Sequence, residues 1–229
     1  MRKWRGWQRT GVGGILLGLI ACGSDSGGST PSGPISALVS SGDEQIGAVG
    51  TALAAPVVVR VSQGGAALAG QGVSWSASGG STLSPASGST GANGLASTTL
   101  TLASSPDIIT ISASVSGVGS PVAFRAYAVP VNATVVEVRN NVFAPVSVTI
   151  ARGSAVTWVW RTTSANHNVV PDATSPTSSG GLVNGPRLYT ASFPTAGTYR
   201  YYCTAHGAAG GSGARSCAAL GAGRRGSGG

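Results

Sequence analysis

The chain has 229 residues, of which 41% are hydrophobic and only 9% charged, so it can form one or two ordinary domains. Gly, Ser, Thr, Ala and Val dominate, and no long stretch shows helical periodicity, which favours an all-β fold. The net charge is +8, but seven positive charges lie in residues 2–9 and 215–225, and the remaining +1 excludes a basic face for nucleic acid.

Residues 1–22 have the pattern of an export signal. Basic residues at positions 2–9 precede the apolar residues 12–21, a stretch shorter than the roughly 20 residues that a membrane-spanning helix needs. The stretch ends in Leu19-Ile20-Ala21-Cys22, which resembles a bacterial lipobox. This resemblance implies that Cys22 is lipidated and becomes the mature N-terminus. An ordinary secretory signal with an incidental cysteine is the alternative.

The residues after Cys22 favour the lipoprotein prediction. Residues 23–34 form a Ser-, Gly- and Pro-rich linker that has little to bury, as expected of a tether. Acyl chains contribute about 0.8 kcal/mol per buried CH₂, and the several chains of a bacterial lipoprotein give stable membrane anchoring. Gly23 in place of Asp resembles the outer-membrane sorting pattern. We therefore expect a lipid-anchored protein of the cell envelope, in the outer membrane facing the periplasm or on the cell surface.

Residues 35–129 contain short strand-like runs separated by turn signals. Residues 72–76 alternate between apolar and polar side chains, and an Asn93-Gly94 turn precedes the strand-like residues 95–102. Regular short strands between Gly, Pro and Asn predict a β-sandwich. The stretch resembles a bacterial Ig-like domain of the invasin/intimin type. This resemblance implies a spacer or a weak interaction module, and we identify no site in it.

Residues 130–213 contain a second β pattern, which begins at Pro130. Its motifs, in chain order, are Phe143-x-Pro145, Gly153-x-x-Val156-x-Trp158, His167-Asn168, and Gly197-Thr198-Tyr199-x-Tyr201-x-Cys203-x-x-His206. As an ordered set with these spacings, they resemble the cupredoxin family of plastocyanin-like, type 1 copper proteins. The resemblance implies a Greek-key β-sandwich or barrel. We therefore predict an all-β chain in which an Ig-like sandwich is followed by a cupredoxin domain.

The cupredoxin resemblance implies a role for each of four residues. His167 and His206 supply imidazoles and Cys203 a thiolate to type 1 copper, and Asn168 ties the two ligand segments together. Thiolate suits Cu(I), and imidazole suits both Cu(I) and Cu(II). The only two histidines of the chain fall at these positions. The alternatives are two ordinary loop histidines and a disulfide between Cys203 and Cys217, which would contribute about 3 kcal/mol and destroy the site.

The end of the chain departs from the cupredoxin pattern. The expected axial methionine position falls at Ala214, and Met1 is the only methionine. Residues 214–229 form a Gly- and Arg-rich tail without a β-branched residue, so we expect that it does not pair and that the last strand is missing. This change of composition motivates the hypothesis of a shifted reading frame or a truncated gene. If the tail is instead the true end of the domain, we expect a copper site with three ligands, or with a weak fourth ligand from a backbone carbonyl near Asn166.

The leading functional prediction is a membrane-tethered carrier of single electrons between redox partner proteins, with copper as its cofactor and no enzymatic activity. A copper oxidase or nitrite reductase needs several more histidines than the two present. Copper storage or delivery would use the same ligands. The alternative from another class is a cell-surface adhesion or structural protein with a degenerate cupredoxin domain, because the methionine and the last strand are missing. We expect no nucleic-acid partner.

Overall fold

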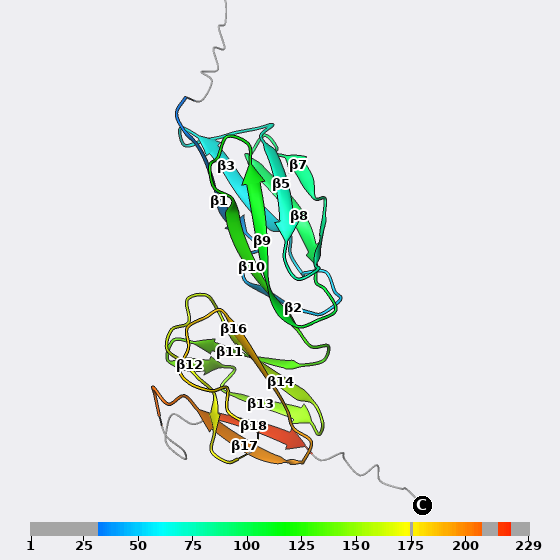
Figure 1. The fold of residues 1–229 in the computed structure, drawn as a ribbon, viewed down its shortest axis with the longest axis vertical. Coiled ribbons are helices and arrows are strands. Elements are labelled where there is room, and N and C mark those ends of the chain that lie inside the picture. The colour runs from blue at the N-terminus through cyan, green and yellow to red at the C-terminus, as the bar shows by residue number, and fades with distance from the viewer. Residues whose placement is uncertain (1–31, 175, 208–214, 221–229) are drawn as a thin grey trace, which may run out of the picture. The chain divides into compact units, whose positions relative to one another are not determined.

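The computed structural model describes residues 32–174, 176–207 and 215–220, and within these ranges every regular element is a β-strand. The prediction of an all-β fold is therefore confirmed. Two β-sandwiches follow one another along the chain, and each consists of two sheets (Figure 1). The described residues contain no helix with the length and apolar character needed to cross a membrane.

The first sandwich is built from two five-stranded sheets. One sheet has the order β1 (Ile35–Ser41), β3 (Val57–Gln63), β8 (Leu95–Thr101) and β6 (Thr82–Ser84), with β4 (Ala66–Ala67) paired to β3. The other has the order β2 (Gln45–Ala48), β10 (Val122–Val129), β9 (Asp107–Val115), β5 (Gly72–Ala77) and β7 (Ser87–Ser89). Alternate side chains on β3 and β5 are buried, as the period-two pattern of a half-buried strand requires.

The predicted turn at Asn93-Gly94 is present between β7 and β8. Gly94 adopts a φ of 72°, and a Cβ at this position would lie 2.4 Å from the carbonyl oxygen of Val61. Only glycine avoids both the left-handed strain and this clash. The core of the sandwich contains Trp75 and Phe124, whose ring centroids are 6.0 Å apart. The sandwich predicted for residues 35–129 is thus observed, and its invasin/intimin-type kinship stays a prediction.

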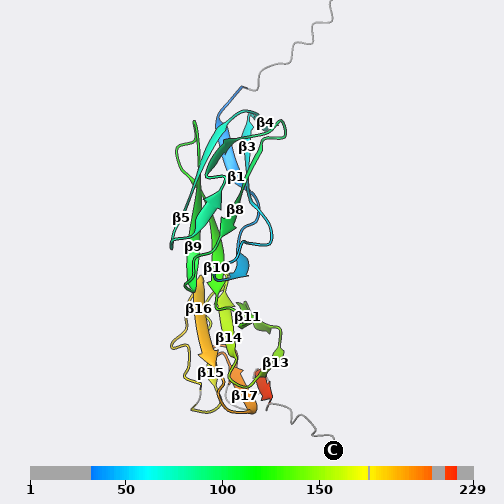
Figure 2. The ribbon, with the colours of Figure 1, turned by 90° about the vertical axis from the view of Figure 1, so that its right-hand side faces the viewer.

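The second sandwich is built from two four-stranded sheets (Figure 1 and Figure 2). One has the order β12 (Val142–Ala144), β11 (Thr134–Arg139), β14 (Ala155–Trp160) and β16 (Arg187–Ser192). The other has the order β13 (Ser147–Ala151), β18 (Arg215–Leu220), β17 (Gly197–Tyr202) and β15 (Val170–Pro171). Both sheets are mixed, because β11 pairs with β14, and β13 with β18, in parallel.

Aromatic side chains from both sheets fill the core of the second sandwich. Trp158 of β14 packs edge-on against Tyr201 of β17, with ring centroids 5.3 Å apart and planes at 85°. Phe143 of β12 packs against the same tyrosine at 5.0 Å. Such pairs contribute about 0.5–1.5 kcal/mol each beyond their burial. They fix the position of β17, the strand that ends directly before Cys203.

Residues 215–220 form β18, so the prediction that the C-terminal tail cannot pair is wrong. β18 lies between two neighbours: Ala218 is opposite Thr149 on parallel β13 and opposite Thr198 on antiparallel β17. Poor intrinsic propensity costs at most about 1 kcal/mol per residue and depends on context. Here the context decides, because β13 and β17 both present backbone groups that need partners. The sheet therefore has a strand where the sequence suggested an exposed edge.

The substitution Ala218→Pro tests this pairing. Proline lacks the backbone N–H, and a lost interior hydrogen bond costs about 1–3 kcal/mol. We expect the free energy of unfolding, measured by chemical denaturation, to fall by that amount. Ala218→Ser keeps the N–H and serves as the control with little change. Equal stability of the proline variant and the wild type would contradict the assignment of β18.

A part-buried ion pair joins β11 to the end of β14. Arg161 binds Glu137 with two nitrogens, Nη2 to Oε1 at 2.8 Å and Nε to Oε2 at 3.1 Å. The Glu137 side chain is 17% exposed and that of Arg161 28% exposed. The hydrogen bond from Arg161, assisted by Arg139, lowers the pKa of Glu137 to about 2. The ionised carboxylate therefore favours the folded state.

Because this ion pair requires an ionised Glu137, we expect the folded protein to lose stability in acid. Because the pKa of Glu137 falls from 4.5 to about 2 on folding, its contribution is complete above pH 4.5 and is lost as the pH falls through about 2. Thermal unfolding of the wild type and of Glu137→Gln over this pH range measures the contribution. The wild type should be more stable near neutral pH, and the difference should shrink in acid. A difference independent of pH would contradict the prediction.

Candidate metal centre

Three possible ligands meet in the second sandwich: His167 between β14 and β15, and Cys203 and His206 after β17. One ligand atom from each residue lies within 4.8 Å of the other two. Cys203 Sγ is 3.5 Å from His167 Nδ1, and the two imidazole centroids are 4.8 Å apart. A first-row metal ion forms bonds of about 2.0–2.3 Å to nitrogen and sulfur. The three donors are therefore close enough to share one ion.

His167 is held by its backbone and is 3% exposed. Its N–H and C=O pair with the C=O and N–H of Val183, both at 3.0 Å. Trp160 Nε1 also donates to the His167 carbonyl at 3.3 Å. Burial, with a smaller contribution from His206, lowers the pKa of His167. The lowered pKa favours the neutral ring, the form in which an imidazole binds metal.

Cys203 is a free, buried cysteine with 4% exposure, directly after β17. A turn follows it, in which the His206 N–H donates to the Cys203 carbonyl at 3.0 Å, and His206 is exposed. The alternative of a disulfide with Cys217 is contradicted. Cys217 pairs with Tyr199, four residues before Cys203, a distance of roughly 13 Å along a strand. A disulfide requires Cα atoms within about 7 Å.

Asn168 links the two ligand-bearing segments and is itself buried. Its Oδ1 accepts the Thr204 N–H at 2.9 Å and the Thr204 hydroxyl at 3.2 Å. Its Nδ2 donates to the Gly180 carbonyl at 3.1 Å. These contacts fit the role that the cupredoxin resemblance implied for Asn168. The other two predicted site residues, Ala214 and Cys22, lie outside the described residues.

Asn140 is a site residue that sequence reasoning missed. It lies in the two-residue turn between β11 and β12, and its Oδ1 is 3.3 Å from His167 Nε2. The pair Asn140-Asn141 has the composition of a turn, and no local signal connects it to a position 27 residues away. The turn itself explains Asn141, which adopts the positive φ of 67° that asparagine tolerates. Asn140 is not needed for the turn geometry, and this was the one hint in the sequence that it has another role.

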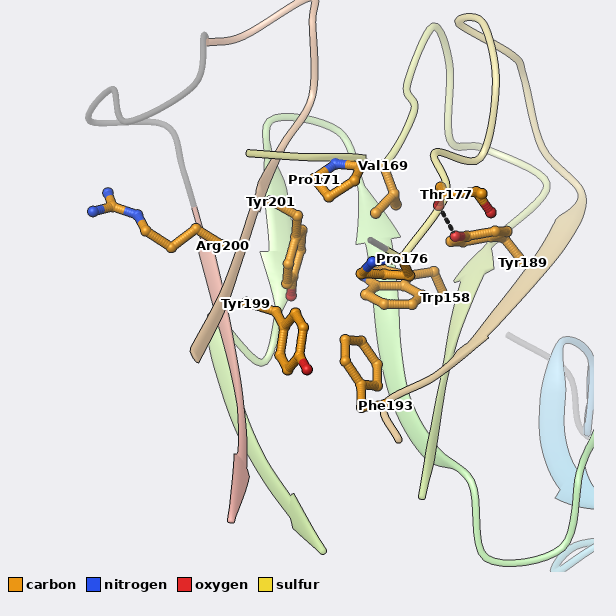
Figure 3. A pocket seen from close by; sticks show the side chains of 10 residues that line it. All are labelled: Trp158, Val169, Pro171, Pro176, Thr177, Tyr189, Phe193, Tyr199, Arg200 and Tyr201. Atoms are coloured by element: carbon orange, nitrogen blue, oxygen red, sulfur yellow. Dashed lines mark hydrogen bonds between the residues drawn. The ribbon is translucent and has the colours of Figure 1, made fainter. Parts of the chain in front are cut away.

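A small cavity of about 10 Å³ lies in the aromatic core near these segments (Figure 3). Figure 3 shows Trp158 and Phe193 facing Tyr199 and Tyr201 across it. The indole Nε1 of Trp158 is buried and has no hydrogen-bond partner among the described residues. The volume is suited to roughly one water molecule. The cavity is thus a feature of core packing and is too small for an organic substrate.

Comparison with known proteins identifies the family. The family model of copper binding proteins, plastocyanin/azurin family, matches residues 131–214. The chain is 41% identical to plastocyanin of Scenedesmus fuscus over an alignment of 78 residues, and the match covers 30% of this chain and 79% of that protein. Through its second sandwich, the chain belongs to the plastocyanin/azurin family of copper binding proteins.

Two solved structures of cupredoxins are also similar to this chain. An amicyanin variant in the reduced state is 25% identical, covers 40% of this chain and 86% of its own, and gives a TM-score of 0.34. A purple cupredoxin from Nitrosopumilus maritimus is 18% identical, covers 38% of this chain and 99% of its own, and gives a TM-score of 0.31. The family assignment depends on the plastocyanin match.

The substitution Asn168→Ala is expected to loosen the centre even without metal. It removes the hydrogen bonds that the buried Asn168 amide makes to Thr204 and Gly180, and a typical hydrogen bond contributes about 0.5–1.5 kcal/mol. Chemical denaturation of the metal-free chain measures this loss. Asn184→Ala is the matched control, because Asn184 is exposed and its Oδ1 accepts the N–H of Asn166 at 2.9 Å. Equal effects of the two substitutions would contradict a special role for Asn168.

Proposed function

We propose that this chain is an electron carrier that binds one copper ion through His167, Cys203 and His206. The observation that carries the proposal is the meeting of two imidazoles and one buried cysteine sulfur in a plastocyanin/azurin-family domain. This donor set suits copper in both oxidation states. When bound, copper supplies the one-electron couple, and the protein performs no bond chemistry.

The surrounding residues suit electron transfer because they limit movement of the ligands. The backbone of His167 is paired to Val183, and Asn168 joins the His167 segment to Thr204 beside Cys203. A rigid donor frame changes little between oxidation states, which keeps the reorganisation energy small. Burial of His167 and Cys203 excludes water, whereas the exposed His206 offers a contact for a redox partner protein.

The sequence has no methionine for the usual axial position, which falls at Ala214. The axial ligand tunes the potential of such sites. A thioether stabilises Cu(II) more than it stabilises Cu(I) in this frame, so its loss is expected to raise the reduction potential. The alternative function, adhesion with a degenerate copper domain, was based on the missing methionine and a missing strand. With β18 in place, one of these two grounds is removed.

The proposed location is the cell envelope, with the chain tethered to a membrane through lipidated Cys22. Support comes from the lipobox-like residues 19–22 and the polar linker that follows them. In this proposal the first sandwich is a spacer between the lipid anchor and the copper domain. The redox partner is a protein of the same compartment.

Copper titration of the reduced chain tests the proposal. The experiment uses Cys22→Ala protein, so that no lipid is attached, and follows the visible spectrum and EPR during addition of Cu(II). We expect an intense thiolate-to-copper band that saturates at one copper per chain. Cys203→Ser should abolish the band, and Cys217→Ser, the matched control, should keep it. A folded chain without the band would favour the degenerate-domain alternative.

Copper storage or delivery uses the same ligands and needs a separate measurement. Electron self-exchange between reduced and oxidised protein is compared with transfer of copper to a chelator. Exchange that is faster than copper release supports an electron carrier. Slow exchange with rapid release of the metal would favour storage or delivery.

A further inference from the structure

We infer that Asn140 is a positioning residue for this centre: its side-chain oxygen selects the tautomer of His167 that leaves Nδ1 free for metal. The inference rests on the proposed copper function, although its first test does not require metal. Asn140 lies in the turn between β11 and β12, and His167 lies between β14 and β15. Folding brings Asn140 Oδ1 to 3.3 Å from His167 Nε2.

Two backbone contacts determine which end of the Asn140 amide faces the imidazole. The Ala165 N–H donates to Oδ1 at 3.1 Å, and Nδ2 donates to the Thr163 carbonyl at 3.3 Å. An amide oxygen can only accept and an amide nitrogen can only donate. In a flipped amide, the NH₂ group would face the Ala165 N–H, donor against donor, and the amide oxygen would face the Thr163 carbonyl, acceptor against acceptor. Both contacts therefore disfavour the flipped orientation. The oxygen, not the nitrogen, therefore faces His167.

An acceptor at this position decides which nitrogen of His167 carries the hydrogen. A neutral imidazole has one N–H group and one nitrogen with a free lone pair. Because Asn140 Oδ1 only accepts, the hydrogen is favoured on Nε2. The lone pair is then on Nδ1, which is 3.5 Å from Cys203 Sγ. Partners of this kind set the tautomer and orientation of histidine ligands.

The backbone contacts of His167 do not make this selection, and the Cys203 contact at Nδ1 agrees with it, because an S–H group can donate to a lone pair on that nitrogen. Val183 and Trp160 bind its backbone, and these bonds place the residue without distinguishing the two ring nitrogens. Asn140 also binds Thr163 and Ala165, which belong to the loop that carries the ligand. Its side chain thus fastens the ligand loop to the β11–β12 turn and orients the ring at the same time.

Nitrogen-15 NMR of the metal-free full chain, at a pH where the imidazole is neutral, tests the tautomer directly. We expect the wild type to show the Nε2–H form of His167. Asn140→Ala should show a mixture of tautomers. Water would take the place of the amide oxygen, and water can either donate a hydrogen bond or accept one. Asn141→Gly is the matched control: it alters the same turn, and glycine accepts the φ of 67°. It should keep the wild-type tautomer.

Copper affinity and reduction potential provide the second test. Asn140→Ala should bind copper about tenfold more weakly, the low end of the range for such partners, because water can enter this exposed position. Asn140→Asp keeps an acceptor and should keep the Nε2–H form. Its added negative charge favours Cu(II) and should lower the potential below that of the wild type. This variant also separates the lost acceptor from general damage to the turn.

Two results would overturn the inference. One is an Nδ1–H form of His167 in the wild type. The other is an alanine variant with the wild-type tautomer and a copper affinity within about twofold of the wild type. Absence of copper binding in every variant, the wild type included, would instead reject the proposed function. In that case the NMR measurement still decides the role of Asn140.

Discussion

The hydrogen bond from the Thr204 N–H to Asn168 Oδ1 is the contact on which the centre most depends. His167 and Cys203 are 36 residues apart in the chain and follow strands of different sheets. Aromatic packing between the sheets brings their segments near each other, but side-chain packing alone tolerates shifts that a metal site does not. The buried amide, bonded on both its oxygen and its nitrogen, fixes the separation of the two segments.

The centre combines rigidity with access on one side only. Two of the three donors, those of His167 and Cys203, are buried, whereas His206 is exposed in the turn that follows Cys203. Because His206 is only three residues from Cys203, any molecule that touches this turn lies near the sulfur as well as the imidazole. In the proposed function, the short turn that supplies a ligand would therefore also shorten the path of an electron.

The sequence predicted the features that depend on short-range order. The all-β fold follows from alternation and turn residues, and the ligand set is implied by the resemblance to the cupredoxin family, which depends on ordered motifs such as Cys203-x-x-His206. It failed where distant partners decide. β18 forms because β13 and β17 border it, despite poor propensity. Asn140 has the composition of a turn, and only the folded chain places it beside His167.

The pairing of Tyr201 with Arg215 has a consequence for how this site can vary. It makes the ligand-bearing connection from β17 to β18 a closed loop whose ends are held by the sheet. The entropy cost of closing such a loop grows only slowly, by about 0.6 kcal/mol for each doubling of its length. Insertions or replacements between Cys203 and Arg215 can thus alter the metal environment at little cost to folding. The sandwich functions as a fixed frame in which the chemistry of the loop is free to diverge.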